Sequence, residues 1–475
     1  MKKNRLTLIV ITIISFIFFF SIGFDISPYL RGPAPYPPDW RWPYQFTNTI
    51  SKLWFPALTI VGLLFFFFYI EKLDEREINK KQWVILAAAI FLHFLFQFSI
   101  LFFSRAGIGV LLQRIIQPDM NGYFTAALSI KNIPQFLSTY NESVLSFPMH
   151  ATGHPPGSIL FFWLVNQLSA VLTPLQSFIS SIRFSHQDVQ LIWNALSLNQ
   201  KFGAFVSTSL IPLFSSLSLL LVFVLGKELY SVRAAIRSVF LFMTIPAIVL
   251  FVPLSDVFFP LFFLLSFWVF LKGLRDKKLL LIFLSGILFF LGLFFSMSLL
   301  PLLLLFAYFI FLYSYKKKLN MQKLLSFGFA YVLGLVILPF LLFVLFQFNS
   351  LAVAKTLISW LPKGRQYHVW ILYNLYDFFV YTGIPLFLLY VKMILSKVKD
   401  HLFIAFTIML LLLNFSGAVR GEVGRIWIPF MPVLVLFIAN FLTYRLKFSK
   451  NYFAYILFLQ AVQIVIMQEF WVPLW

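Results

Sequence analysis

Residues 117–123 read QPDMNGY, and residues 147–157 read FPMHATGHPPG. Both stretches lie in one long loop, roughly residues 105–201, which begins where an apolar run ends. Together they place an acid, two histidines, a glycine turn and a double proline close to one another in sequence. Most of the surrounding chain is too apolar to carry chemistry. We therefore expect this loop to cover a functional site at a membrane surface.

The composition is that of a polytopic membrane protein. Of the 475 residues, 61% are hydrophobic and 64 are phenylalanines, more than a soluble core of this size needs. A helix needs about 20 apolar residues to cross a bilayer, and such runs recur along the whole chain, which leaves no room for a large soluble domain. The net charge of +21 does not indicate nucleic-acid binding, because the basic residues sit in short loops between apolar runs, as the positive-inside rule describes. The chain has no cysteine, which excludes disulfides, Cys-ligated zinc and thiol catalysis.

These runs predict an all-α, polytopic integral membrane protein with about 13 transmembrane helices, plus surface-lying helices in the large outer loop. The first run, 6–24, follows basic residues but lacks a small-residue cleavage site, so we expect an uncleaved span. The other spans are expected at 52–70, 83–103, 203–225, 236–253, 257–271, 279–296, 298–314, 324–347, 370–391, 401–416, 426–443 and 452–468.

Residues 157–173 decide the topology. The segment is apolar enough to span, but prolines bracket it and its polar residues fall near one helical face, which fits a helix lying in the interface. If it lies flat on the outer surface, the later inner loops hold 17 Lys and Arg and the outer loops hold 7. If it spans, that ratio inverts. Because Lys and Arg favour the cytoplasmic side, we expect a surface helix in a multi-pass cell-membrane protein whose N-terminus is cytoplasmic.

The sequence suggests three segments. Residues 1–82 form a two-span segment with an aromatic, proline-rich outer loop at 25–46, which is either an interfacial aromatic belt or a lid that stacks on a sugar. Residues 83–315 form the candidate catalytic module and include the outer loop 104–202. Residues 316–475 hold the C-terminal membrane helices, with outer loops at 349–369 and 416–425.

Asp119 is the first candidate catalytic residue. It follows a proline and precedes Asn121 and Gly122, a pattern that favours a turn just beyond a span. A carboxylate at a half-dry interface is poorly solvated, which suits a general base. The alternative is that Asp119 caps a helix over residues 120–130. Asp256, in a later outer turn, is the second candidate, either as the base or as a ligand of a metal or acceptor.

His150 and His154 are four residues apart, a spacing that can place two histidines on one helix face to bind a metal. However, Pro155 and Pro156 follow directly, and a residue before a proline avoids the helical conformation. The sequence therefore favours hydrogen bonds from these histidines to a phosphate or a sugar hydroxyl over a zinc pair.

Two cationic clusters lie in loops expected on the outer face. The first is RGEVGR at 420–425, in which Arg420 and Arg425 flank Glu422. The second consists of Lys363, Arg365 and His368. Interfacial anchoring is the simple explanation of such charges. Two arginines beside a glutamate also form a phosphate clamp in which the glutamate orients the arginines. Outer cations run against the positive-inside bias, and an anionic ligand would account for them.

Two polar residues fall inside expected spans. Asp377 lies within 370–391, and an acid inside a membrane is a functional candidate by default. Its alternative role is to bind a tyrosine hydroxyl. His93 lies within 83–103 and is better explained as a core residue with satisfied hydrogen bonds.

In their order and spacing, four short motifs resemble the GT-C superfamily, the polytopic glycosyltransferases that use polyprenyl-phosphate sugars. PDMNGY at 118–123 resembles the acid-containing start of the family's first outer loop, and HPP at 154–156 resembles its Lys-Pro-Pro element before a surface helix. GKELYSVR at 226–233 resembles a basic turn, and LSD at 254–256 the acidic outer turn that follows it. The resemblance covers residues 83–310 and is strongest to aminoarabinose transferases and protein O-mannosyltransferases. His154 replaces the family's lysine, and Met120 replaces a glutamate beside its acid.

The resemblance implies a glycosyltransferase with its active site on the outer face. The donor would be a polyprenyl-phosphate sugar, the acceptor a glycan, lipid or protein, and the bilayer a further partner; no nucleic acid is expected. Asp119 would take the acceptor proton, with Asp256 as the alternative base. The residues expected to bind substrate or phosphate are Tyr123, His150, His154, Lys363, Arg365, His368, Arg420, Glu422 and Arg425. No cofactor is certain, and the change at Met120 leaves a role for Mg or Mn open. The alternatives are a lipid or oligosaccharide transporter or flippase, and a glycan polymerase or ligase.

Overall fold

The computed structural model describes residues 2–33, 41–169, 176–318, 320–360 and 365–471. Within these ranges the regular elements are helices, and the one β-interaction is an isolated bridge between Tyr44 and Trp471. The predicted all-α class is therefore confirmed. The residues divide into two compact units, each assembled from separate parts of the chain. Unit 1 comprises Met1–Ile108, Leu213–Val252 and Gly364–Leu474, and unit 2 comprises Gly109–Pro212 and Pro253–Lys363. The three-segment division remains a prediction along the sequence.

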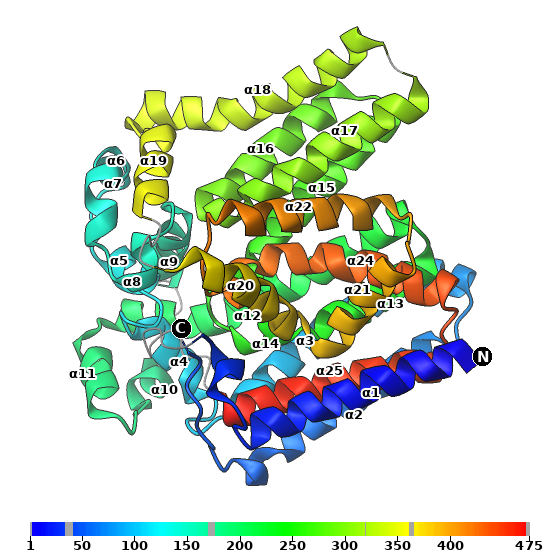
Figure 1. Cartoon of the computed structure of the whole chain (residues 1–475). Coiled ribbons are helices and arrows are strands. Elements are labelled where there is room, and N and C mark those ends of the chain that lie inside the picture. Colours follow the sequence, from blue (N-terminus) through cyan, green and yellow to red (C-terminus); the bar gives the residue numbers. More distant parts are fainter. Residues whose placement is uncertain (1, 34–40, 170–175, 319, 361–364, 472–475) are drawn as a thin grey trace. The chain divides into compact units, whose positions relative to one another are not determined.

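Unit 1 contains most of the long helices of the N- and C-terminal regions (Figure 1). Its helices are α1 (Lys2–Gly23), α2 (Trp54–Ile70), α3 (Glu75–Phe102), the second part of α12 (Leu198–Leu229), α13 (Val232–Met243), α14 (Pro246–Leu250), α20 (Tyr367–Thr382), α21 (Ile384–Leu395), α22 (His401–Ser416), α23 (Val423–Ile426), α24 (Met431–Asn440) and α25 (Lys450–Phe470). Helix α25 packs against both α1 and α2, and α13 packs against α24. The C-terminal helix is thus a structural centre of this unit.

Unit 2 contains the short helices of the long loop at 105–201 and a group of longer apolar helices. Its helices are the first part of α12, α4 (Gly109–Ile116), α5 (Tyr123–Leu128), α6 (Ile133–Ser138), α7 (Tyr140–Ser143), α8 (Met149–Thr152), α9 (Gly157–Ser169), α10 (Gln176–Ser181), α11 (Gln187–Ala195), α15 (Phe259–Asp276), α16 (Leu279–Phe295), α17 (Leu303–Lys317), α18 (Met321–Phe346) and α19 (Ser350–Trp360). Helix α16 packs against α15 and α18, and α5 packs against α9.

Eight helices of the described chain are long and apolar enough to cross a membrane, or nine if one bent pair counts as a span. The protein is therefore a multi-pass helical membrane protein by length and composition, but the predicted count of 13 is not confirmed. One reason is local: the span expected at 236–253 is divided into α13 and α14, because Pro246 starts a new helix after a break at Thr244 and Ile245. Helices α2, α16 and α22 are apolar but have only 17, 17 and 16 residues.

The span expected at 370–391 is broken. Helices α20 and α21 meet at an angle of 117°, and Gly383 between them has φ 112°, which glycine adopts readily. Two glutamines of α25 bind the backbone at this break. The Gln463 amide oxygen accepts from Ile384 N (2.9 Å), and its nitrogen donates to Val380 O (2.8 Å). Gln460 donates to Thr382 O (3.0 Å). The protein thereby satisfies backbone groups that a broken helix would otherwise expose to lipid.

Helix α9 bears on the predicted surface helix. It has 13 described residues, and at about 1.5 Å per residue it is shorter than the roughly 30 Å hydrocarbon layer. Residues 170–175 of the predicted segment lie outside the described residues. The flat placement stays a prediction.

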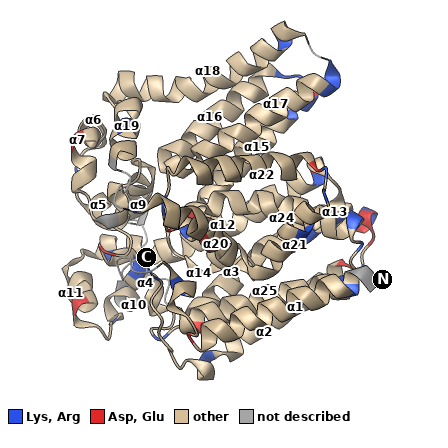
Figure 2. Cartoon of the chain, viewed as in Figure 1, with Lys and Arg blue, Asp and Glu red and all other residues tan. Residues whose placement is uncertain are grey.

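Charge is unevenly placed within each unit: in unit 1 it gathers near the start of α1 and around α13, and in unit 2 at the connection of α17 and α18 (Figure 2).

Candidate functional site

The motif QPDMNGY forms a turn between α4 and α5. Helix α5 begins at Tyr123, and its N-cap is Gly122, with φ 71°. The alternative that Asp119 caps this helix is therefore wrong. A side chain at Gly122 would put its Cβ 2.5 Å from Pro148 O, so glycine is required where the two quoted motifs meet. The Asp119 side chain is exposed, so it does not lie in the half-dry environment that its position in the sequence suggested.

Three segments of unit 2 converge on His154. The imidazole makes an edge contact with the Tyr123 ring, with centroids 5.4 Å apart, and it lies 6.4 Å from the Phe259 ring at the start of α15. The structure thus brings the segments of Asp119, His154 and Asp256 together, which the sequence alone could only suggest through a resemblance. His150 is buried on α8, and His154 lies beyond the end of that helix.

Tyr140 holds the histidine segment in place. Its hydroxyl donates to His154 O at 2.7 Å, and its ring packs against Phe136, Phe147 and Phe348. The side chain is fully buried, and desolvation raises the pKa of its hydroxyl well above the usual value. Tyr140 therefore acts as a neutral donor that fixes the backbone at His154. No motif in the sequence identifies this role of Tyr140.

Asp256 differs sharply from Asp119. It is 2% exposed and lies in the short helix that precedes α15. Among the described residues of these converging segments, the buried polar atoms without a hydrogen-bond partner include Asp256 Oδ2, Ser255 Oγ, Asn121 Nδ2, Gln117 Oε1 and Ser158 Oγ. Leaving such an atom unpaired costs about 1–3 kcal/mol, so each calls for a partner from outside the chain, such as water or a ligand.

Arg114 is a further buried polar residue of unit 2 that the sequence interpretation missed. It lies on α4, is nearly inaccessible to solvent, and burial lowers its pKa to about 10. That value still leaves the guanidinium charged at neutral pH. An arginine within the otherwise apolar run of 109–116 was the available signal.

The arginine cluster of unit 1 is built on one carboxylate. Glu422 accepts from Arg365 Nη2 at 2.7 Å through one oxygen and from Arg425 Nη2 at 3.0 Å through the other. The side chains of Arg425 and Arg365 are only 4% and 8% exposed, whereas that of Glu422 is 26% exposed. We call these three residues the outer cluster. Its two buried cations share one partly exposed anion, an arrangement able to attract a second anion.

The loop that carries the outer cluster is tied back to the segment before α20. Arg420 Nη1 donates to Arg365 O at 2.7 Å, and Arg365 Nη1 donates to Arg420 O. Gly421 has φ 91°, and a Cβ there would lie 2.5 Å from Arg365 Nη1. His368 is exposed on the first turn of α20, and Lys363 lies outside the described residues. The predicted site residues are divided between the two units. Unit 2 contains Asp119, Tyr123, His150, His154 and Asp256. Unit 1 contains Arg365, His368, Arg420, Glu422 and Arg425.

Two residues of the expected spans have partners that the sequence did not reveal. Asp377 accepts from Gly424 N (2.8 Å) and from Trp42 Nε1 (3.3 Å), and neither of these two partners is a tyrosine hydroxyl. Trp42 itself is buried, which disfavours a mobile stacking role for this residue of loop 25–46. His93 is fully buried, as expected of a core histidine, and its Nδ1 lies 3.1 Å from Gln97 Nε2.

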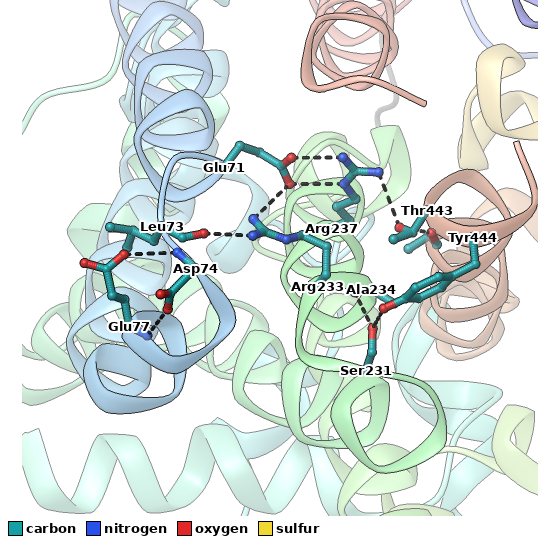
Figure 3. Close-up of polar contacts among 11 residues, drawn as sticks. Glu71, Leu73, Asp74, Glu77, Ser231, Arg233, Ala234, Arg237, Thr443 and Tyr444 are labelled. Atoms are coloured by element: carbon teal, nitrogen blue, oxygen red, sulfur yellow. Dashed lines mark hydrogen bonds and ion pairs between the residues drawn. The ribbon is translucent and has the colours of Figure 1, made fainter. Parts of the chain in front are cut away.

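The basic turn at 226–233 leads into a second cluster of one glutamate and two arginines (Figure 3). Glu71 accepts from Arg237 Nε (3.1 Å) and Nη2 (2.9 Å), and Arg233 Nη1 lies 3.7 Å from the same carboxylate. Arg233 also donates to Leu73 O at 2.8 Å. We call Glu71, Arg233 and Arg237 the inner cluster. It joins α13 to the turn between α2 and α3.

Among the described residues, no three His, Asp or Glu side chains come together in a group that could hold a metal ion, and Met120 offers no carboxylate beside Asp119.

Comparison with known proteins assigns no family to the chain: no protein-family model matches it, and no curated protein sequence matches it significantly.

Proposed function

We propose that this protein is a membrane glycosyltransferase that moves a sugar from a polyprenyl-phosphate donor to an acceptor hydroxyl on the outer face of the cell membrane. The observation that carries the proposal is the outer cluster, in which Arg365 and Arg425 are buried yet share one partly exposed carboxylate. Buried arginines in a loop expected outside run against the positive-inside bias. A lipid phosphate would account for them, because guanidinium groups bind phosphate in a bidentate manner.

In the proposed reaction the acceptor oxygen attacks the anomeric carbon while the bond from that carbon to the phosphate oxygen breaks. The phosphate leaves with the bonding electrons, and cationic side chains stabilise its added charge, so no acid is needed. A carboxylate takes the proton of the acceptor hydroxyl. The transition state resembles an oxocarbenium ion, as in other glycoside chemistry, and a single displacement inverts the anomeric configuration.

Burial favours Asp256 over Asp119 as that base. Asp119 is exposed, whereas Asp256 is buried and has an oxygen without a partner among the described residues. A base must be within hydrogen-bond reach of the proton that it abstracts, and an oxygen without an internal partner is available for such a bond. His154 and Tyr123 lie in the converging segments and are proposed to contact the acceptor or the sugar.

The experiment compares Asp119→Asn with Asp256→Asn. General-base catalysis contributes about 10²–10⁴-fold, so we expect the base variant to lose turnover in that range while it remains folded. Surface glycans are measured by mass spectrometry in cells that lack the protein and carry the parent or a variant. Loss confined to Asp119→Asn would exchange the two roles. Unchanged glycans in cells without the protein would refute the proposed function.

A transporter is the second candidate, because the bent pair α20 and α21 is a discontinuous helix of the kind that transporters use to bind substrates. However, Gln460 and Gln463 already bind the backbone groups at the break. The break is therefore filled by protein side chains. Substrate uptake into proteoliposomes that contain the purified protein, without any glycosyl transfer, would favour the transporter.

A further inference from the structure

Helix α20 presents two polar side chains, one turn apart, to the loop that precedes α23. Asn374 Oδ1 accepts from Gly421 N at 2.9 Å, and Asn374 Nδ2 donates to Val419 O at 2.8 Å. Asp377 Oδ2 accepts from Gly424 N at 2.8 Å. All of these residues belong to unit 1. The loop that carries the arginines is therefore bound through its backbone to one face of a helix.

The loop needs such support because its own conformation is unfavourable. Glu422 has φ 58° and follows Gly421 at φ 91°. A residue other than glycine rarely adopts this left-handed backbone conformation. A residue keeps this unfavourable backbone conformation where surrounding contacts hold it in place, and such residues are found mainly at functional sites. Asn374 binds the backbone just before Glu422, and Asp377 binds it just after. The two bonds thus bracket the strained residue that holds both arginines.

Asp377 also connects a third segment. Its Oδ1 accepts from Trp42 Nε1, and the Trp42 ring packs against Phe251 (5.6 Å) and Tyr381 (5.1 Å). The carboxylate is thereby held by a rigid aromatic group on one side and by the loop backbone on the other. A side chain anchored in this way fixes the backbone of Gly424, and it thereby fixes the position of the next residue, Arg425.

We infer that Asp377 is a positioning residue for the outer cluster: it places Arg425, through the backbone of Gly424, where a phosphate can bind. The inference rests on the proposed function only for the identity of that ligand, a polyprenyl phosphate. Asn374 has the matching role on the other side of Glu422. Asp377 touches neither the sugar nor the reacting atoms in this proposal, so its effect must pass through the loop.

The first test measures hydrogen exchange at residue resolution across 417–425 in the full-length protein in detergent. Asp377→Leu removes the acceptor, so we expect exchange at Gly424 to rise about tenfold or more, the effect of losing a hydrogen bond to a charged group. Asp377→Asn keeps one acceptor oxygen but loses the charge and the second acceptor, so its exchange at Gly424 should lie between those of the parent and Asp377→Leu. Asn374→Ala, a second variant in case Asp377→Leu does not fold, should release Gly421 instead. Tyr390→Phe is the control, because it removes the hydrogen bond to Thr407, away from the loop.

The second test measures binding of undecaprenyl phosphate to the same variants by native mass spectrometry. Asp377→Leu should weaken binding about tenfold, Asp377→Asn should weaken it less, and Tyr390→Phe should bind like the parent. Parent-like exchange and binding in Asp377→Leu would overturn the inference. Weakened binding with parent-like exchange at Gly424 would also overturn it, because the effect would then not pass through the loop. If exchange responds as expected but the parent binds no lipid phosphate, the positioning role stands and the proposed function fails.

Discussion

The inner and outer clusters of unit 1 each consist of one glutamate and two arginines, but they differ in how these are held. In the inner cluster both Glu71 and Arg237 are 6% exposed, and the pair is bidentate. In the outer cluster Glu422 is 26% exposed and sits in a left-handed loop position. Regular helices and a capped turn supply the inner residues, whereas the outer loop depends on side chains of α20. The inner cluster is therefore a buried structural link, and the outer one has a carboxylate that solvent reaches.

The largest expected effect concerns the side of the membrane on which each cluster lies. The chain has no cysteine, so single cysteines can be labelled with an impermeant reagent. Ser185→Cys and Ala418→Cys should be labelled in intact cells, and Lys81→Cys only after lysis, because the Lys and Arg distribution places the first two outside. All three positions are exposed. Labelling of Ser185→Cys only after lysis would overturn the predicted topology.

The next effect is on stability and tests the inner cluster. Arg237→Ala leaves the buried Glu71 with only the longer ion pair to Arg233, 3.7 Å away, so we expect a loss of up to about 3–5 kcal/mol. Unfolding followed by circular dichroism in detergent should show this loss, whereas turnover per folded molecule should not change. Arg445→Ala, an exposed arginine expected on the same side, is the control and should be nearly neutral. A stable Arg237→Ala protein with impaired turnover would make the inner cluster a functional site.

A smaller effect, on function, is expected in the outer cluster. Arg425→Ala should lower kcat/KM for the donor about 10–100-fold, because a charge-assisted bond to phosphate is lost. Arg425→Lys should recover only part of the activity, since an ammonium group cannot form a bidentate pair. Steady-state kinetics with the lipid-linked donor provide the measurement. Full activity in Arg425→Ala would reduce the outer cluster to a membrane anchor.

The smallest effect separates the two glutamates. Glu422→Gln should lower the free energy of unfolding, because the buried Arg365 and Arg425 lose their charged partner, but the loss should be limited because the carboxylate removed is partly exposed. Glu71→Gln should be clearly more destabilising. Donor affinity of Glu422→Gln should change a few-fold as the arginines lose their shared partner. Equal destabilisation by the two variants would show that the clusters do not differ in kind.

Much of the fold follows from residue type and spacing. Apolar runs predicted the long helices, and twelve of the expected spans correspond to one described helix or to the bent pair. The exception is 236–253, where Pro246 starts a separate helix. The break at Gly383 was also missed, because hydropathy reports how apolar a segment is and not whether its helix is continuous. The side chains that close that break lie on α25, about 80 residues further along the chain.

The sequence by itself determined the membrane class, the helical fold and the concentration of Arg420, Glu422 and Arg425 in one loop, because these depend on composition and on neighbours in the chain. Only the tertiary structure decided that Glu422 pairs with Arg365, that Asp377 binds Gly424 and Trp42, and that Asp256 is buried while Asp119 is exposed. Those facts depend on contacts between residues far apart in sequence and on which side chains the packing of helices removes from solvent, and no local pattern contains either.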